Sequence, residues 1–389
     1  MGKIYLGLLK GAEGFERALA LKMLKDATTS DPSFVRMFID EARILARLSH
    51  PGIVQIYELG KEDNVLFLVM ELLFGQSLAD VWHECHERGY ILRGDVVAWI
   101  GARVAEALQY AHEARAVDGT LQNLVHRDVN PSNIIVTYDG HIKLIDFGLV
   151  KGEGRLSKTE HGVVKGKIAY LSPEQTSGKE PDRRSDIFSL GTTLWEVSAD
   201  ARLFKRESDL ETFSAIREAE VPDPTRLVPE YPSLLWLVLR RALARDVDQR
   251  YATMAELARD LDGVARAHGS ILQASTIAEI MSALFAEEQK KEAAWFKEAM
   301  APQPKENLSM LRPPGPRQRA ASDLAAMPDL PYLVPAPLPP AVPRRPQETT
   351  MMLSGGEEPR RFAPRPMAIA AAVGLALALV IVAIVELLR

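Results

Sequence analysis

The sequence predicts an α+β protein in which a strand-rich part precedes a helix-rich part. Two observations support this prediction. Early segments such as RALALKML (17–24) and NVLFLVME (64–71) are apolar runs of strand length, whereas later segments such as SDIFSLGTTLWEVS (185–198) and LLWLVLRRALA (234–244) repeat apolar residues at helical spacing. A chain of 389 residues with 47% hydrophobic content can bury a large core, and we expect residues 1–300 to fold.

Composition narrows the class of protein. The single cysteine, Cys85, rules out an internal disulfide and a multi-cysteine metal cage, which indicates a reducing compartment. The formal net charge is −5 and no basic field stands out, so we expect no nucleic-acid partner. The bulk of the chain is predicted to be cytoplasmic.

The composition changes beyond residue 300. Sixteen of the 25 prolines lie in 301–366, which predicts a linker without packed structure. Residues 367–385 then run for 19 positions without a charge, and at about 1.5 Å per residue such a helix approaches the ~30 Å thickness of the hydrocarbon core. We therefore expect a transmembrane helix over 367–388. A buried core helix is the alternative, but no folded partner adjoins the segment.

The charges that flank this apolar segment predict its orientation. Arg360, Arg361 and Arg365 precede it and only Arg389 follows it, so the positive-inside rule keeps the N-terminal side in the cytoplasm. We expect a single-pass C-terminal anchor in the inner membrane. Only ELLR follows the apolar run, so input is expected through the cytoplasm, the bilayer or self-association of chains.

The stretch NIIVTYDGHIKLID (133–146) predicts two strands joined by a two-residue turn at Asp139-Gly140. Pairing outward from that turn places Asn133 opposite Asp146, with Cβ atoms about 5 Å apart. An amide oxygen beside a carboxylate suits Mg²⁺. Two polar strand ends that face solvent are the alternative.

Asp128 adds a third polar group to this loop. It lies five residues before Asn133, and Pro131 between them holds the segment out of a helix. An aspartate near a metal-bound phosphate can accept a proton from an attacking hydroxyl, which is the chemistry of phosphoryl transfer.

A second constellation lies upstream. Residues 31–50 carry apolar residues spaced for one helix face, namely Phe34, Phe38, Leu45 and Leu48. Glu41 falls on that face and needs a cationic partner. Lys22 is the nearest candidate in sequence, and a solvated surface pair is the alternative.

Together these motifs resemble the eukaryotic-like (Hanks-type) protein kinase family in its bacterial serine/threonine branch, from Gly2 to about residue 268. The resemblance implies a two-lobed fold, with an antiparallel sheet and one helix over 1–73 and a mainly helical lobe over 74–268. It also implies transfer of the γ-phosphate of ATP to Ser/Thr hydroxyls of protein substrates, with Mg²⁺. An amphipathic extension, 269–300, either packs on the second lobe or serves a partner.

The resemblance assigns catalytic roles. Lys22 would hold the α- and β-phosphates and pair with Glu41, Asp128 would be the catalytic base, and Asn133 and Asp146 would ligate magnesium. The remaining ATP contacts begin with Gly2 at the Gly-rich loop, Met70 as gatekeeper, and Glu71 and Leu73 as hinge. The residues that would sandwich the purine are Ile4, Ala20, Ile135 and Ile145, for which ordinary core packing is the alternative.

Structural contacts follow from the same resemblance. Glu174, in SPE (172–174), is expected to pair with Arg250. Asp186 is expected to brace the backbone of HRDVNPSN (126–133), which resembles the catalytic loop of the family.

A regulatory pattern is also implied. Arg127 precedes the catalytic aspartate, as in kinases switched by a phosphate on the activation segment, and Ser157 or Thr159 could carry that phosphate.

The sequence departs from the family in two places. Only the last part of the Gly-rich loop appears, with Gly2 as its third glycine. We expect either that the true start lies upstream of Met1 or that ATP binds under an incomplete Gly-rich loop, and we favour the former. Serine/threonine kinases also usually place a lysine where Asn130 stands and a threonine where Lys167 stands. We expect Lys167 to reach Asp128 and replace the missing lysine; a solvent-facing lysine is the alternative.

Two other functions stay open. A pseudokinase scaffold at the membrane has no need of the complete set of Lys22, Glu41, Asp128, Asn133 and Asp146. A small-molecule phosphotransferase has no need of the SPE segment that would support a protein substrate.

Overall fold

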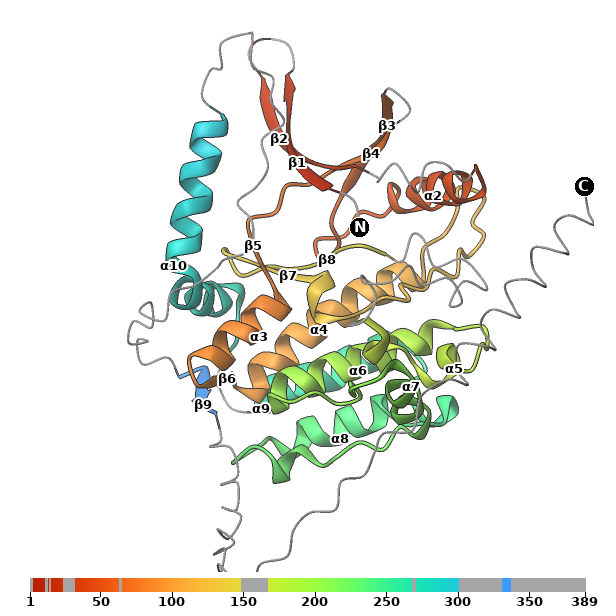
Figure 1. Ribbon diagram of the computed structural model, residues 1–389, viewed down its shortest axis with the longest axis vertical. Coiled ribbons are helices and arrows are strands. Elements are labelled where there is room, and N and C mark those ends of the chain that lie inside the picture. Colours follow the sequence, from red (N-terminus) through yellow and green to blue (C-terminus); the bar gives the residue numbers. More distant parts are fainter. Residues whose placement is uncertain are drawn as a thin grey trace, which may run out of the picture. The chain divides into compact units, whose positions relative to one another are not determined.

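A sheet with one helix forms the first lobe of the chain (Figure 1). The computed structural model describes residues 3–10, 13, 15–23, 32–62, 65–147, 167–267, 271–300 and 331–336, all within a unit that spans Met1–Leu338. The antiparallel strands are β1 (Lys3–Lys10), β2 (Glu16–Met23), β4 (Val65–Met70) and β3 (Ile56–Glu62), in that spatial order. Helix α2 (Pro32–Leu45) contacts β3.

The apolar pattern explains this lobe. Leu66 and Leu68 alternate with less buried residues along β4, and they share a core with Phe38 and Leu45 of α2. Leu48, which we predicted on the same helix face, is also buried, but it lies beyond the end of α2 at Leu45.

The second lobe is mainly helical. Its helices are α3 (Leu78–Glu87), α4 (Gly94–His112), α5 (Pro173–Thr176), α6 (Arg183–Ala199), α7 (Asp209–Glu218), α8 (Ser233–Ala242) and α9 (Met254–Ala267). Helix α6 is buried on every face from Ser185 to Ala199, between α4 and α8, which marks it as the centre of this lobe. The expected order, strands before helices, is confirmed.

A small sheet joins the lobes. Residues 71–74 form the connection between the lobes, from the end of β4 to the start of β5 (Gly75–Ser77). Strand β5 pairs with β7 (Ile134–Thr137), which pairs in turn with β8 (Ile142–Leu144). Two short β-strands remain, β6 (Tyr90–Leu92) and β9 (Leu333–Pro335).

The predicted register of the β7–β8 hairpin was wrong by one residue. The backbone N–H of Ile145 donates to the carbonyl oxygen of Asn133 at 2.9 Å, so Asn133 lies opposite Ile145 rather than Asp146. The loop has three residues, 138–140, instead of two. Gly140 adopts a φ of 87°, and a left-handed residue at the third position closes such a loop.

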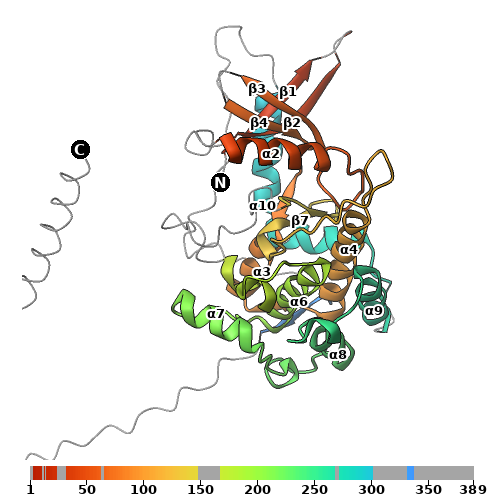
Figure 2. The same ribbon diagram turned by 90° about the vertical axis from the view of Figure 1, so that its right-hand side faces the viewer.

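The extension beyond the second lobe is helix α10 (Ala274–Ala299). Its first half packs on the second lobe through Ile277, Ile280, Met281 and Leu284. Phe285 leaves helical geometry (φ −129°, ψ 28°), and beyond this kink the helix runs beside the connection between the lobes, as both views show (Figures 1 and 2). The first half of this segment therefore packs on the second lobe, which is one of the two alternatives that we expected.

The linker prediction requires a correction at one place. Residues 331–336 are ordered, and strand β9 pairs antiparallel with β6. Leu333 is the buried residue of this strand, Val334 is half-buried and Pro335 is exposed. The rest of 301–366 and the predicted helix 367–388 lie outside the described residues. Among the helices that the structure describes, none combines the length and the apolar character needed to cross a bilayer.

Candidate active site

The loop before β7 holds Asp128 and Asn133 together. Asn130 shapes the loop, because its Oδ1 accepts from the backbone N–H of Ser132 at 3.0 Å and its Nδ2 donates to the carbonyl of Asp128 at 2.8 Å. Pro131 then starts a turn of 3₁₀ helix that ends at Asn133. The Nδ2 of Asn133 donates to the Asp128 carbonyl (2.7 Å) and to its Oδ2 (3.0 Å). The capping role of Asn130 was not predicted from the sequence, although Asn before Pro is a known turn pattern.

Lys167 also reaches this carboxylate. Its Nζ lies 2.8 Å from Oδ2 of Asp128, at the start of the 3₁₀ turn Lys167–Tyr170. The lysine side chain is 20% exposed and the aspartate side chain 11% exposed, so the contact is only partly screened by solvent. The structure thus places Lys167 on Asp128, as we expected from the sequence.

The second pair at the site is Lys22 with Asp146. Lys22, on β2, donates from Nζ to Oδ1 of Asp146, and the side chains are 17% and 29% exposed. Asp146 adopts a φ of 56°, a left-handed conformation that is uncommon among residues other than glycine and that occurs at functional sites. Glu41 lies in helix α2, but its side chain is outside the described residues, so the expected contact with Lys22 stays a prediction.

These donors fit a hard divalent cation. Asn133 uses its amide nitrogen on Asp128, which leaves Oδ1 as the atom able to ligate a metal. Asp146 uses Oδ1 on Lys22, and its Oδ2 carries no hydrogen bond from the part of the chain that the structure describes. One carboxylate and one amide oxygen, with phosphate oxygens and water, match the few protein ligands that Mg²⁺ requires.

A buried aspartate holds the backbone of the loop that carries Asp128. Asp186, in α6, accepts from the backbone N–H groups of His126 and Arg127, each at 2.8 Å, and lies 2.8 Å from Nε2 of His112. Burial alone would raise the pKa of Asp186, but the hydrogen bond and the charge of His112 lower it. The carboxylate can therefore hold two successive backbone amides, and Arg127, which carries the second of them, adopts a φ of 62°.

Glu174 and Arg250 form the second expected contact. The guanidinium donates to both carboxylate oxygens, at 2.8 and 2.9 Å, and the Ser185 hydroxyl donates to Oε1 at 2.6 Å. Burial acts to raise the pKa of Glu174, but Arg250 and Ser185 together lower it to about 2. This bidentate pair fixes the SPE segment to the helical lobe.

The residues expected to surround the purine lie around the connection between the lobes. Ala20 is 5% exposed and pairs with Met70 across β2 and β4, whereas Ile4 is 46% exposed. Ile135 and Ile145 are half-buried, and Leu73 lies in the connection. The remaining expected residues, Gly2, Ser157 and Thr159, lie outside the described residues.

The start of the connection is fixed by a contact that the sequence did not reveal. The carboxylate of Glu71 lies 2.9 Å from Nζ of Lys143 through each of its oxygens, and its backbone N–H donates to the carbonyl of Gln55. Glu71 and Lys143 lie 72 positions apart and in different elements, so no local pattern in the sequence indicates this contact.

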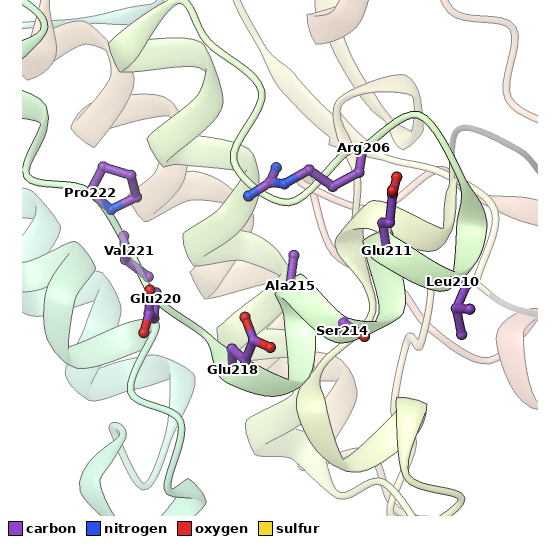
Figure 3. Close-up of a pocket in the computed structure, with 9 residues that line it drawn as sticks. All are labelled: Arg206, Leu210, Glu211, Ser214, Ala215, Glu218, Glu220, Val221 and Pro222. Carbon is purple, nitrogen blue, oxygen red and sulfur yellow. The ribbon is translucent and has the colours of Figure 1, made fainter.

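A large cavity in the described part of the chain lies elsewhere. It measures about 730 Å³ and is lined by α7 and the segments on either side of it, including Arg206, Glu211, Glu218 and Val221 (Figure 3). None of its lining residues belongs to the pair of Lys167 with Asp128 or to the pair of Lys22 with Asp146. The candidate active site is therefore defined by contacts between side chains and not by cavity size.

The sheet lobe, the helical lobe and the polar groups between them define a protein kinase. Residues 2–261 match the protein kinase domain family, and the chain belongs to that family. It is 39% identical over 289 residues to the tyrosine-protein kinase MasK of Myxococcus xanthus, covering 74% of this chain and 45% of the relative. It is 36% identical over 250 residues to the serine/threonine-protein kinase PknL of Mycobacterium tuberculosis, covering 64% of this chain and 60% of PknL.

Further comparisons agree. The serine/threonine-protein kinase PrkC of Bacillus subtilis is 32% identical over 251 residues, covering 63% of this chain and 36% of PrkC. The crystal structure of the Mycobacterium tuberculosis PknI kinase domain superposes with a TM-score of 0.52 at 29% identity, covering 68% of this chain and 91% of that domain. The chain thus spans less than two thirds of the length of the curated relatives it matches.

Proposed function

We propose that this chain is an ATP- and Mg²⁺-dependent protein kinase that phosphorylates Ser and Thr hydroxyls of protein substrates. The observation that carries the proposal is the Asp128 carboxylate, which the Asn133 amide and the Lys167 ammonium hold in place at 3.0 and 2.8 Å. Lys22 and Asp146 lie together as a second charged pair. The serine/threonine kinases among the relatives support the choice of acceptor.

Each of these residues has a separate role in phosphoryl transfer. Asp128 accepts the proton of the attacking hydroxyl while the new bond from that oxygen to the γ-phosphorus forms and the bond to the β-phosphate oxygen breaks, which releases ADP. The positive charge of Lys167 offsets charge on the transferring group, and Lys22 is placed to hold the other phosphates. Asn133 and Asp146 would hold Mg²⁺, which when bound neutralises phosphate charge and aligns the oxygens.

Incubation of the full chain with γ-labelled ATP, Mg²⁺ and a generic protein acceptor tests this proposal. We expect phosphoserine and phosphothreonine in the products, and Asp128→Asn should remove them while the variant still binds nucleotide. Binding without transfer in the wild-type chain would instead support the pseudokinase scaffold, and transfer only to a small molecule would support a small-molecule phosphotransferase.

Tyrosine is the second candidate acceptor. The observation in its favour is the relative at 39% identity that is named a tyrosine-protein kinase. Acid hydrolysis of the labelled products releases the three phosphoamino acids, and electrophoresis then separates them. Phosphotyrosine alone would replace our first proposal by the second.

Autophosphorylation is part of the proposal. Arg127 lies beside the catalytic aspartate, and Ser157 and Thr159 belong to the segment between Asp146 and Glu174 that would carry a regulatory phosphate. Mass spectrometry of the chain after incubation with ATP should find phosphate on one of these two residues. Phosphate confined to other regions would contradict this assignment.

Membrane anchoring is likewise a proposal, supported by the uncharged run 367–385 and its flanking arginines. Cells that express the full chain should retain it in the membrane fraction after a carbonate wash, whereas a chain without 367–388 should be released. Release of both proteins to the same extent would contradict the anchor.

A further inference from the structure

Helix α10 reaches the connection between the lobes through one face of its second half. Residues 288, 289, 292, 295, 296 and 299 are half-buried, whereas the residues between them are mostly exposed. This spacing of three and four positions is that of a single helix face. The face therefore lies against the protein, although it is less buried than the first half of the helix.

The kink at Phe285 turns the second half of α10 so that this face lies against the connection between the lobes. Arg88, which follows α3, donates to the carbonyls of Ala283 and Leu284 at 3.3 and 2.8 Å, so the bend leaves these backbone oxygens with a partner. At the other end of the first half, Gly140 approaches Ala274 so closely that a Cβ at that glycine would lie 1.8 Å from the Ala274 oxygen. The hairpin turn and α3 thus fix where the second half begins.

Polar and aromatic contacts then hold the second half in place. Oε1 of Glu292 accepts from the Tyr138 hydroxyl and from Nε2 of Gln76, each at 3.1 Å. Four residues further on, Phe296 packs edge-on against Phe74, with ring centroids 5.1 Å apart. Both Gln76 and Phe74 lie directly after the expected hinge, so α10 is attached to the segment that positions the purine.

Between these attachments and the sheet lies a cavity of about 200 Å³. Its lining comes from β1, from the connection and from α10, and consists of Ile4, Tyr5, Leu6, Leu72, Leu73, Phe74, Gly75, Glu292 and Trp295. Ile4 and Leu73 are two of the residues that the family resemblance assigns to ATP. The cavity therefore adjoins the expected purine site, and α10 supplies the outer wall.

We propose that Trp295 of α10 forms part of the nucleotide site, where its indole packs against the purine nucleotide held by Ile4 and Leu73. An aromatic ring beside an apolar cavity suits a flat base, because base and ring both present extended π faces. Glu292 and Phe296 act as positioning residues that hold the indole at the hinge. The inference rests on the proposed function, since it needs ATP to bind between the lobes.

Photolabelling of the full chain with 8-azido-ATP and Mg²⁺ tests the contact directly. Label that unmodified ATP suppresses should map to the α10 peptide that contains Trp295, as well as to β1 or the connection. Suppressible label on β1 and the connection alone would overturn the inference and leave the proposed kinase function intact. Absence of suppressible label anywhere on the chain would overturn both.

Calorimetric titration with ATP and Mg²⁺ gives the second measurement. Trp295→Ala should raise the Kd for ATP by roughly tenfold, and Trp295→Phe should restore most of the wild-type affinity. Lys297→Ala, a change at an exposed position on the same helix, should bind ATP with the wild-type Kd. In turnover assays Trp295→Ala should raise KM for ATP with kcat unchanged. A Trp295→Ala chain that melts at a lower temperature but binds ATP with the wild-type Kd would show that α10 only braces the fold, which overturns the inference.

Discussion

The Nζ atom of Lys167 lies 2.8 Å from Oδ2 of Asp128, although 39 positions separate the two residues. We expect Lys167→Met to lower kcat by about 10²–10³-fold, because the variant loses one preorganised positive group beside the transferring phosphate. The Kd for ATP should change little, since Lys22 and Asp146 are untouched. Single-turnover kinetics and calorimetry measure the two quantities separately.

Lys179→Met is the matched control for this substitution. Lys179 follows the SPE segment and its side chain is exposed, so the same change of charge should leave kcat at the wild-type value. Equal turnover in Lys167→Met and the wild type would show that the contact is a passive surface interaction.

Removal of the Asp146 carboxylate should make the affinity for ATP independent of Mg²⁺. In the wild-type chain we expect Mg²⁺ to strengthen ATP binding, because Asp146 and Asn133 supply oxygen ligands beside the phosphates. Asp146→Asn should bind ATP with a Kd that no longer depends on Mg²⁺. Titration of ATP at several Mg²⁺ concentrations measures this dependence.

Asp139→Asn provides the same chemical change on the exposed turn of the same hairpin. It should retain the full effect of Mg²⁺. Were Mg²⁺ to strengthen binding equally in Asp146→Asn and in Asp139→Asn, Asp146 would have no part in the metal site.

The motifs of this site could be predicted from the sequence because each one is local. The distance from Asp128 to Asn133 is set by a five-residue loop with Pro131 in it, and the structure brings these side chains together as that loop implies. The contact of Lys167 with Asp128 could be expected only by way of the family resemblance, which showed one lysine missing and another added.

Features that depend on backbone conformation or on distant packing were harder to predict. The hairpin register differs by one residue because only Gly140 adopts a positive φ, whereas the predicted two-residue type I′ turn needs a positive φ at Asp139 as well. Asp-Gly alone is compatible with both loop lengths. The kink at Phe285 depends on Arg88, which is distant in sequence and has no motif around it. In 331–336 the surrounding prolines concealed a three-residue strand that forms by pairing with β6, which is distant in sequence.

Stability in acid should depend on Glu174. Its pKa falls from the ordinary 4.5 to about 2 in the folded chain, so the charged form is favoured by folding. This contribution is complete above pH 4.5 and is lost as the pH falls toward 2. Glu174→Gln should therefore lower the thermal midpoint at neutral pH and should flatten its decline between these two values.

Glu180→Gln, at an exposed position a few residues away, should keep the wild-type pH profile. Arg250→Met should destabilise the chain by about 3–5 kcal/mol and by more than Glu174→Gln, because it leaves a carboxylate without its guanidinium in a mostly buried site. Thermal melts of Glu174→Gln and the wild type that decline in parallel from neutral pH to about pH 3 would exclude the pair as a source of acid sensitivity.

The strand Leu333–Pro335 should protect its own segment from proteolysis. Its backbone is held at both ends, since the N–H of Arg93 donates to the Tyr332 carbonyl at 3.0 Å and the N–H of Ala336 donates to the Gly89 carbonyl at 2.8 Å. Leu333 is the buried side chain between them, and a buried leucine contributes about 1.5–3 kcal/mol, so Leu333→Asp should raise the released fraction by about tenfold or more. Chymotrypsin should then cut after Tyr332 faster than in the wild type, while Pro335→Ala, whose side chain is exposed, should be cut slowly. Equal rates in all three chains would mean that the segment leaves β6 too readily for the pairing to matter in solution.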